Sequence, residues 1–97
     1  MTIEPPFTLA GIEAMPIPQL DALDALAITK AAGTIPSLQR EELQEFLAAL
    51  DLLKEHKQYA AADAYADGEL ELSQQLAAAA DAAIAGIAAG KAALQDL

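Results

Sequence analysis

Two long segments of the chain repeat apolar side chains at helical spacing, and the first covers residues 38–66. At about 100° per residue, its leucine, phenylalanine and alanine side chains gather on one face. The pattern predicts a helix roughly 45 Å long at about 1.5 Å per residue, with Ser37 as its N-cap. Its predicted core face consists of Leu43, Phe46, Leu47, Leu50, Leu53, Ala61 and Ala64.

Four side chains of this predicted helix depart from a simple amphipathic pattern. Lys54 and Lys57 fall inside the apolar stripe, where we expect their stems to pack while their ammonium groups reach outward to water. Leu52 and Tyr59 fall almost opposite the stripe. Two interpretations stay open for this second pair: an accidental surface pair, or a second contact face.

The second helical segment covers residues 70–95 and is apolar or alanine on every side. Gly68 is its predicted boundary with the preceding helix. A helix of this composition is buried, or becomes buried on assembly. Gly86 and Gly90 each cost about 1 kcal/mol of helix stability relative to alanine. We therefore expect another backbone to approach closely across this small-residue face.

The first third of the chain predicts one shorter helix and an extended arm. Residues 18–32 carry a helical pattern, with Gly33 as the natural residue after its C-terminus. Residues 1–18 hold four of the five prolines and alternate apolar with other side chains from Ile3 to Leu9. Such an arm has one apolar edge, so we expect it to cover either its own domain or a neighbouring subunit.

The predicted fold class is therefore all-α: a long antiparallel helical hairpin plus one shorter helix, with an extended proline-rich N-terminal arm. Residues 19–97 form a single helical domain in this prediction. Composition agrees, because the chain has 97 residues, four aromatic side chains and no valine, which disfavours a sheet. Since cysteine is absent, disulfides and thiolate metal sites are excluded.

The charge balance limits the partners that the chain can bind. Fifteen acidic against five basic side chains give a net charge of −10. Such a chain repels phosphate and gains nothing from an anionic lipid surface, so we expect neither nucleic acid nor membrane as a partner. The first residues lack the basic start and the apolar core of a secretory signal. We expect a cytoplasmic or particle-associated protein.

Candidate chemistry is sparse, and we expect no catalytic residue, cofactor or metal. His56 is the only histidine and lies away from the apolar stripe. Asp63, Asp67 and Gly68 stand at spacings that resemble part of an EF-hand calcium loop. Tyr65 and Gln74 stand where that loop needs oxygen ligands, the second of them a bidentate glutamate. An acidic helix end with a glycine stop is the simpler interpretation.

These features favour a non-enzymatic structural or assembly protein that packs on itself or in a larger multi-subunit complex. Components of phage particles or secretion machines are the fold-level analogy. The alternative is a small acidic inhibitor or antitoxin-like protein that binds a basic site on a partner protein. The predicted contact residues are Phe7, Leu9, Leu52, Tyr59, Gly86 and Gly90.

Overall fold

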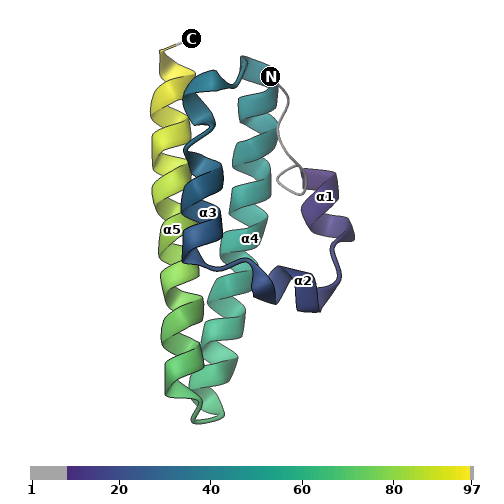
Figure 1. Ribbon diagram of the computed structural model, residues 1–97, viewed down its shortest axis with the longest axis vertical. Helices are drawn as coiled ribbons and strands as arrows, with labels where there is room; N and C mark the ends of the chain where they lie inside the picture. Colours follow the sequence, from purple (N-terminus) through teal and green to yellow (C-terminus); the bar gives the residue numbers. More distant parts are fainter. Residues whose placement is uncertain (1–8, 97) are drawn as a thin grey trace.

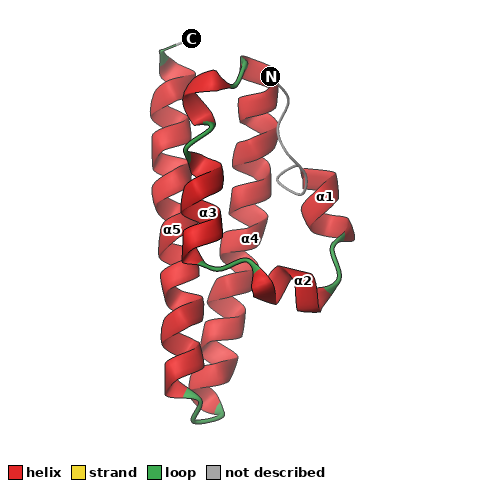
Figure 2. Cartoon of the chain, viewed as in Figure 1, coloured by secondary structure: helices red, strands yellow, loops and turns green. Residues whose placement is uncertain are grey.

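The protein is a helical hairpin with shorter helices packed along part of its length (Figure 1). The structure, a computed structural model, describes residues 9–96, and every regular element in that range is helical (Figure 2). The hairpin consists of α4 (Arg40–Ala66) and α5 (Leu70–Gln95), which run antiparallel. The all-α hairpin predicted from periodicity is therefore confirmed.

The turn between the two long helices is closed by Gly68, as predicted. Its φ of 80° is the only positive φ among the described residues. The N–H of Gly68 donates to the carbonyl oxygen of Tyr65, and the N–H of Glu69 donates to that of Ala64. These are the two bonds of a Schellman motif, in which glycine takes the left-handed position without a steric penalty.

Four short elements precede the hairpin: α1 (Leu9–Ala14), α2 (Ile17–Ala22), α3 (Ala25–Ala32) and the 3-10 helix η1 (Ile35–Ser37). Helix α3 packs along α5, while α1 lies beside α4 (Figure 1). We call these short elements, together with the part of the hairpin that they cover, the body, residues 9–57 and 79–96. The largest fully buried apolar side chains of its core are Ile28, Leu43, Phe46, Leu50 and Leu53.

The rest of the hairpin, residues 58–78, is here called the tip. No other described element lies alongside it (Figure 1). Its buried cluster is small and consists of Ala61, Ala64 and Leu76. A hydrogen bond of 2.8 Å from Ser73 Oγ to the Ala61 carbonyl oxygen joins the two helices there.

The prediction of an extended arm is wrong over residues 9–18. Those residues form α1 and the start of α2, whereas residues 1–8, Phe7 among them, lie outside the described part of the chain. Pro16 is the N-cap of α2 and Pro18 lies in its first turn. Backbone N–H groups at the start of a helix have no partner within the helix. Proline, which lacks this group, therefore loses no hydrogen bond at these positions and can begin a helix.

The predicted helix over residues 18–32 is divided at Asp24. That side chain accepts a 2.9 Å hydrogen bond from the Ala27 N–H and caps α3. The predicted cap at Ser37 is also wrong, because Ser37 ends η1 and its Oγ donates to the carbonyl oxygen of Thr34. Helix α4 begins two residues later than predicted, with Gln39 as its N-cap.

Candidate interaction surface

Two of the predicted contact residues are used by the chain's own body. Leu9 is half-buried in α1, and its backbone N–H donates to Oε1 of Glu45 at 3.1 Å. Leu52 is half-buried and packs against the body core, although its position on the helical wheel suggested a free face. Helix α1 packs against α4, and the second contact face that the sequence left open for Leu52 lies within the chain.

At Gly86 and Gly90, where the sequence predicted the close approach of another backbone, the structure places leucine side chains of α4. A Cβ atom at Gly86 would lie 2.9 Å from Cδ1 of Leu50. A Cβ atom at Gly90 would lie 2.5 Å from Cδ2 of Leu47. Both glycines are buried under leucine side chains of α4, so the face predicted for another backbone is already occupied.

Tyr59 is the predicted contact residue that lies open to solvent, with 76% of its surface exposed. Other large apolar side chains of the tip are also exposed: Tyr65, Leu70 and Leu72. Carboxylates surround them, and the chain has no lysine or arginine between Lys57 and Lys91. The tip therefore combines exposed apolar surface with uncompensated negative charge.

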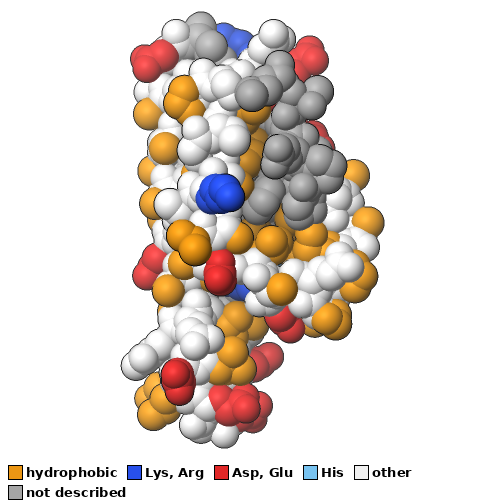
Figure 3. Space-filling model, in the orientation of Figure 1, with side chains coloured by type: hydrophobic (Ala, Val, Ile, Leu, Met, Phe, Trp, Pro, Cys, Tyr) orange, Lys and Arg blue, Asp and Glu red, His pale blue; other side chains and the backbone are white. Residues whose placement is uncertain are grey.

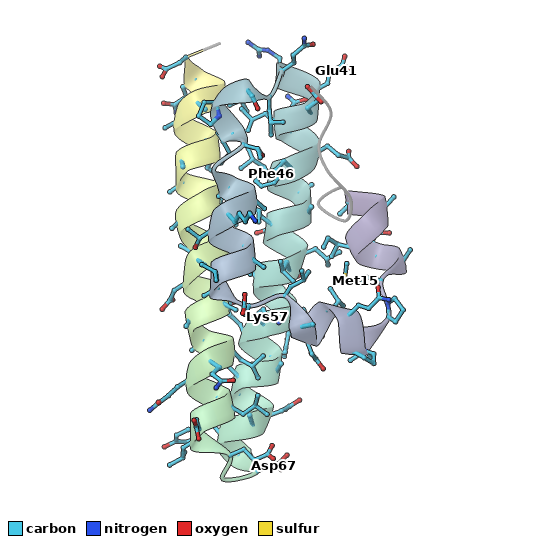
Figure 4. All side chains as sticks on the ribbon, in the orientation of Figure 1. Met15, Glu41, Phe46, Lys57 and Asp67 are labelled. Atoms are coloured by element: carbon cyan, nitrogen blue, oxygen red, sulfur yellow. The ribbon has the colours of Figure 1, made fainter. Side chains whose placement is uncertain are left out.

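Lys57 does not extend to water as predicted; it is buried between α4 and α2. Only 1% of its surface is exposed, and its Nζ donates to the carbonyl oxygens of Leu20 at 2.8 Å and Asp21 at 3.3 Å (Figure 4). Burial lowers the pKa of the Lys57 amine, while the negative charges of Asp21 and Asp24 act in the opposite direction. The ammonium group satisfies carbonyls at the C-terminus of α2 and so fixes this short helix to the hairpin.

The neighbours of Lys57 have ordinary surface roles. Lys54 remains partly exposed, with Nζ 2.9 Å from Oδ1 of Asp51. His56 Nε2 lies 3.3 Å from Oδ1 of Asp21, so the histidine has a partner that the sequence did not reveal. Both contacts join exposed or half-exposed groups. The contact of His56 joins α4 to α2, whereas the ion pair of Lys54 lies within α4.

The surface that sequence reasoning missed is the outward side of α5. Ala77, Asp81, Ile84, Ala88 and Lys91 follow one another at intervals of three or four residues, and all five are exposed. Apolar side chains are visible along the edge of the molecule where α5 runs (Figure 3). The spacing of these residues could be read from the sequence. Because α5 carries alanine on every side, the sequence did not show which side the rest of the protein leaves exposed.

The resemblance of the segment around Gly68 to a calcium loop does not extend to its structure. Tyr65 belongs to α4 and Gln74 to α5, and the connection comprises residues 67–69 alone. Among residues 9–96, no group of three or more His, Cys, Asp or Glu side chains is placed to hold a metal ion.

One open hollow of about 570 Å³ lies where α3, η1 and the C-terminal half of α5 meet. Among the described residues that line it, which include Ile35, Leu38 and Ala93, Asp96 is the one with a titratable side chain.

Comparison of the chain with family models, curated proteins and solved structures gave no match. Within the described residues, α5 is the one helix whose length and composition would allow it to cross a membrane. The expectation that the chain has no membrane partner therefore stays a prediction. Function must be inferred from the surfaces of the body, the tip and α5.

Proposed function

We propose that this protein is a non-enzymatic assembly subunit whose hairpin packs against further copies of itself or within a larger complex. The observation that carries the proposal is the outward side of α5. From Ala77 to Ala92 this side is alanine and isoleucine, interrupted by Asp81 and Lys91. A long apolar surface of this kind on a small protein is typical of an interaction site.

The completeness of the body core supports this proposal. Phe46 and the large leucines of α4 are enclosed by α1, α3 and α5, so the core needs nothing from the outward side of α5. Ile84 is 44% exposed although it lies in the middle of the longest apolar helix. Covering it in an assembly would remove apolar surface from water at about 25 cal/mol per Å².

The test is the mass of the protein in solution, measured by light scattering on a sizing column at low and high salt. We expect a discrete multiple of 10.1 kDa that persists at high salt, because burial of apolar surface is not screened by ions. A particle of 10.1 kDa at every concentration and salt would contradict self-assembly. A pull-down would then decide whether a larger complex supplies the missing partner.

The tip favours a second candidate function, an acidic inhibitor or antitoxin-like protein that occupies a basic site. Asp63, Asp67, Glu69 and Glu71 give this end a charge of −4 with no compensating base. The exposed Tyr59 is an amphipathic anchor for such an interface. This function predicts a monomer whose binding to its partner falls steeply as salt increases.

A further inference from the structure

We propose that the outward side of α5 binds a second copy of this chain, with the two α5 helices antiparallel and centred on Gly86. The inference rests on the proposed function and names its partner and geometry. The contact surface, here called the α5 seam, consists of Ala77, Asp81, Ile84, Ala88, Lys91 and Gln95.

The spacing of the α5 seam is that of a coiled coil. Its members follow at intervals of four, three, four, three and four residues, which is the alternation of core positions in a heptad repeat. Every member is exposed. The seam lies on the side of α5 away from Gly86 and Gly90, which face α4. It is therefore a second, unused packing face on a helix whose first face is already buried.

The charges on the seam select a second copy as the occupant and determine its direction. Asp81 and Lys91 each stand five residues from Gly86, on opposite sides of it. In an antiparallel pair centred there, Asp81 lies level with Lys91 of the second copy, and the reverse contact repeats by symmetry. A parallel pair would place like charges level with each other at both positions.

The apolar members match in the same register. Ile84 and Ala88 each stand two residues from Gly86, so Ile84 lies level with Ala88 of the second copy. An isoleucine opposite an alanine fills the space between two closely spaced helices, whereas two isoleucines would force them apart. A lipid surface fits less well, because Asp81 and Lys91 would then lie in an apolar phase without partners.

Exchanging the two charges tests the proposal. Asp81→Lys alone and Lys91→Asp alone each place like charges level with each other, so we expect the dissociation constant to rise about tenfold or more. The double variant D81K/K91D restores both opposite pairs, and we expect it to restore the mass of the dimer. Asp63→Lys in the tip is the control for net charge, because it changes the charge as Asp81→Lys does but lies outside the seam. If neither single variant raised the dissociation constant of the dimer, the proposal would be overturned.

Cross-linking tests the direction, since the chain has no cysteine of its own. In the antiparallel register Ala77 lies level with Gln95 of the second copy, so a mixture of A77C and Q95C should form a mixed disulfide. Neither variant should form a disulfide with a second molecule of the same variant. In the antiparallel pair, residue 77 of one chain and residue 77 of the other lie 18 residues apart, about 27 Å along the helix, and the same holds for residue 95. Self-linking of A77C would overturn the antiparallel arrangement.

The outcomes separate this inference from the proposed function. An oligomer that shows neither the charge response nor the mixed disulfide would overturn the α5 seam and leave self-assembly standing through another surface. A monomer that floats with phosphatidylcholine vesicles would overturn the seam in favour of lipid. A monomer that does not float would contradict self-assembly as well.

Discussion

The body and the tip both contain stretches of α4 and α5 but differ in what covers those two helices. In the body, α3 and α1 enclose large side chains such as Phe46 and Leu50, which are 1% and 0% exposed. In the tip, α4 and α5 meet only each other, and two of the three buried residues are alanine. Stability is therefore concentrated in the body, while the tip exposes aromatic and leucine side chains. In this chain most of the large side chains are buried where a third element lies beside the helix pair, and the pair alone buries Leu76 between alanines.

The largest expected effect comes from Phe46→Ala in the body. Removing a fully buried aromatic side chain leaves a cavity, so the free energy of unfolding should fall by about 3–5 kcal/mol. Urea unfolding followed by far-UV circular dichroism measures it. Tyr59→Ala on the same helix is the control: this side chain is mostly exposed, and its loss should change stability by about 0.5 kcal/mol or less. Equal losses at the two positions would contradict the division into body and tip.

Lys57→Met should lower the free energy of unfolding by about 1–2 kcal/mol, since the carbonyl oxygens of Leu20 and Asp21 lose a donor while the apolar stem is retained. Hydrogen exchange should accelerate first in α2, which this amine holds to the hairpin. Lys54→Met is the matched control, because Lys54 makes a partly exposed ion pair with Asp51 and its loss should cost about 0.5 kcal/mol at most. Unchanged exchange in α2 would show that Lys57 does not hold that helix.

The same amine predicts how stability depends on pH. Burial lowers the pKa of Lys57 in the folded state below that in the unfolded chain. Between these two pKa values the unfolded chain binds a proton that the folded chain does not, so the Lys57 contribution to the free energy of unfolding rises with pH. Comparison of the wild type with Lys57→Met across the alkaline range isolates this contribution. A contribution that falls with pH would mean that the neighbouring carboxylates outweigh burial.

Leu76→Ala tests the tip. Leu76 is buried among alanines at the open end of the hairpin, so its loss should cost about 1–2 kcal/mol, less than a typical core leucine. The effect should also be local, with faster hydrogen exchange around Ala61 and Ala64 and little change near Phe46. A loss as large and as widespread as that of Phe46→Ala would show that the tip shares the body's cooperativity.

The smallest expected effects come from alanine at the two buried glycines. At Gly86 a new methyl group would meet Leu50, which is fully buried and has no room to move, so we expect a loss of about 1 kcal/mol. At Gly90 it would meet the half-buried Leu47, which can turn outward. There the gain in helix propensity should offset the strain to within about 0.5 kcal/mol. Thermal unfolding distinguishes the two, and the opposite order would contradict this packing.

The predictions from sequence were most accurate where a periodic pattern was long and a residue such as glycine marked its end. The hairpin was recognised because its helical period persists over more than 20 residues on each side of Gly68. Short segments were predicted poorly. Helices of six residues such as α1 and α2 have little stability of their own and form only against a partner. The N-cap at Asp24 was a local signal that the longer predicted helix concealed.

The interaction residues show the same limit. Gly86, Gly90 and Leu52 were recognised as contact residues, but their contacts proved to lie within the chain. Which of two apolar faces is covered depends on where neighbouring helices lie, and the period of one helix does not contain that information. The α5 seam became visible once the buried face of α5 was known.

Sequence alone therefore established an all-helical hairpin, its turn at Gly68 and a net charge of −10. These properties follow from local propensity, periodicity and summed charge, which need no knowledge of distant contacts. Tertiary structure decided the burial of Lys57, the intramolecular use of the glycines and the open side of α5. Each of these depends on residues that are far apart in the chain and meet only after folding. Because a protein interior is closely packed, a helix face that one neighbour covers is closed to any other.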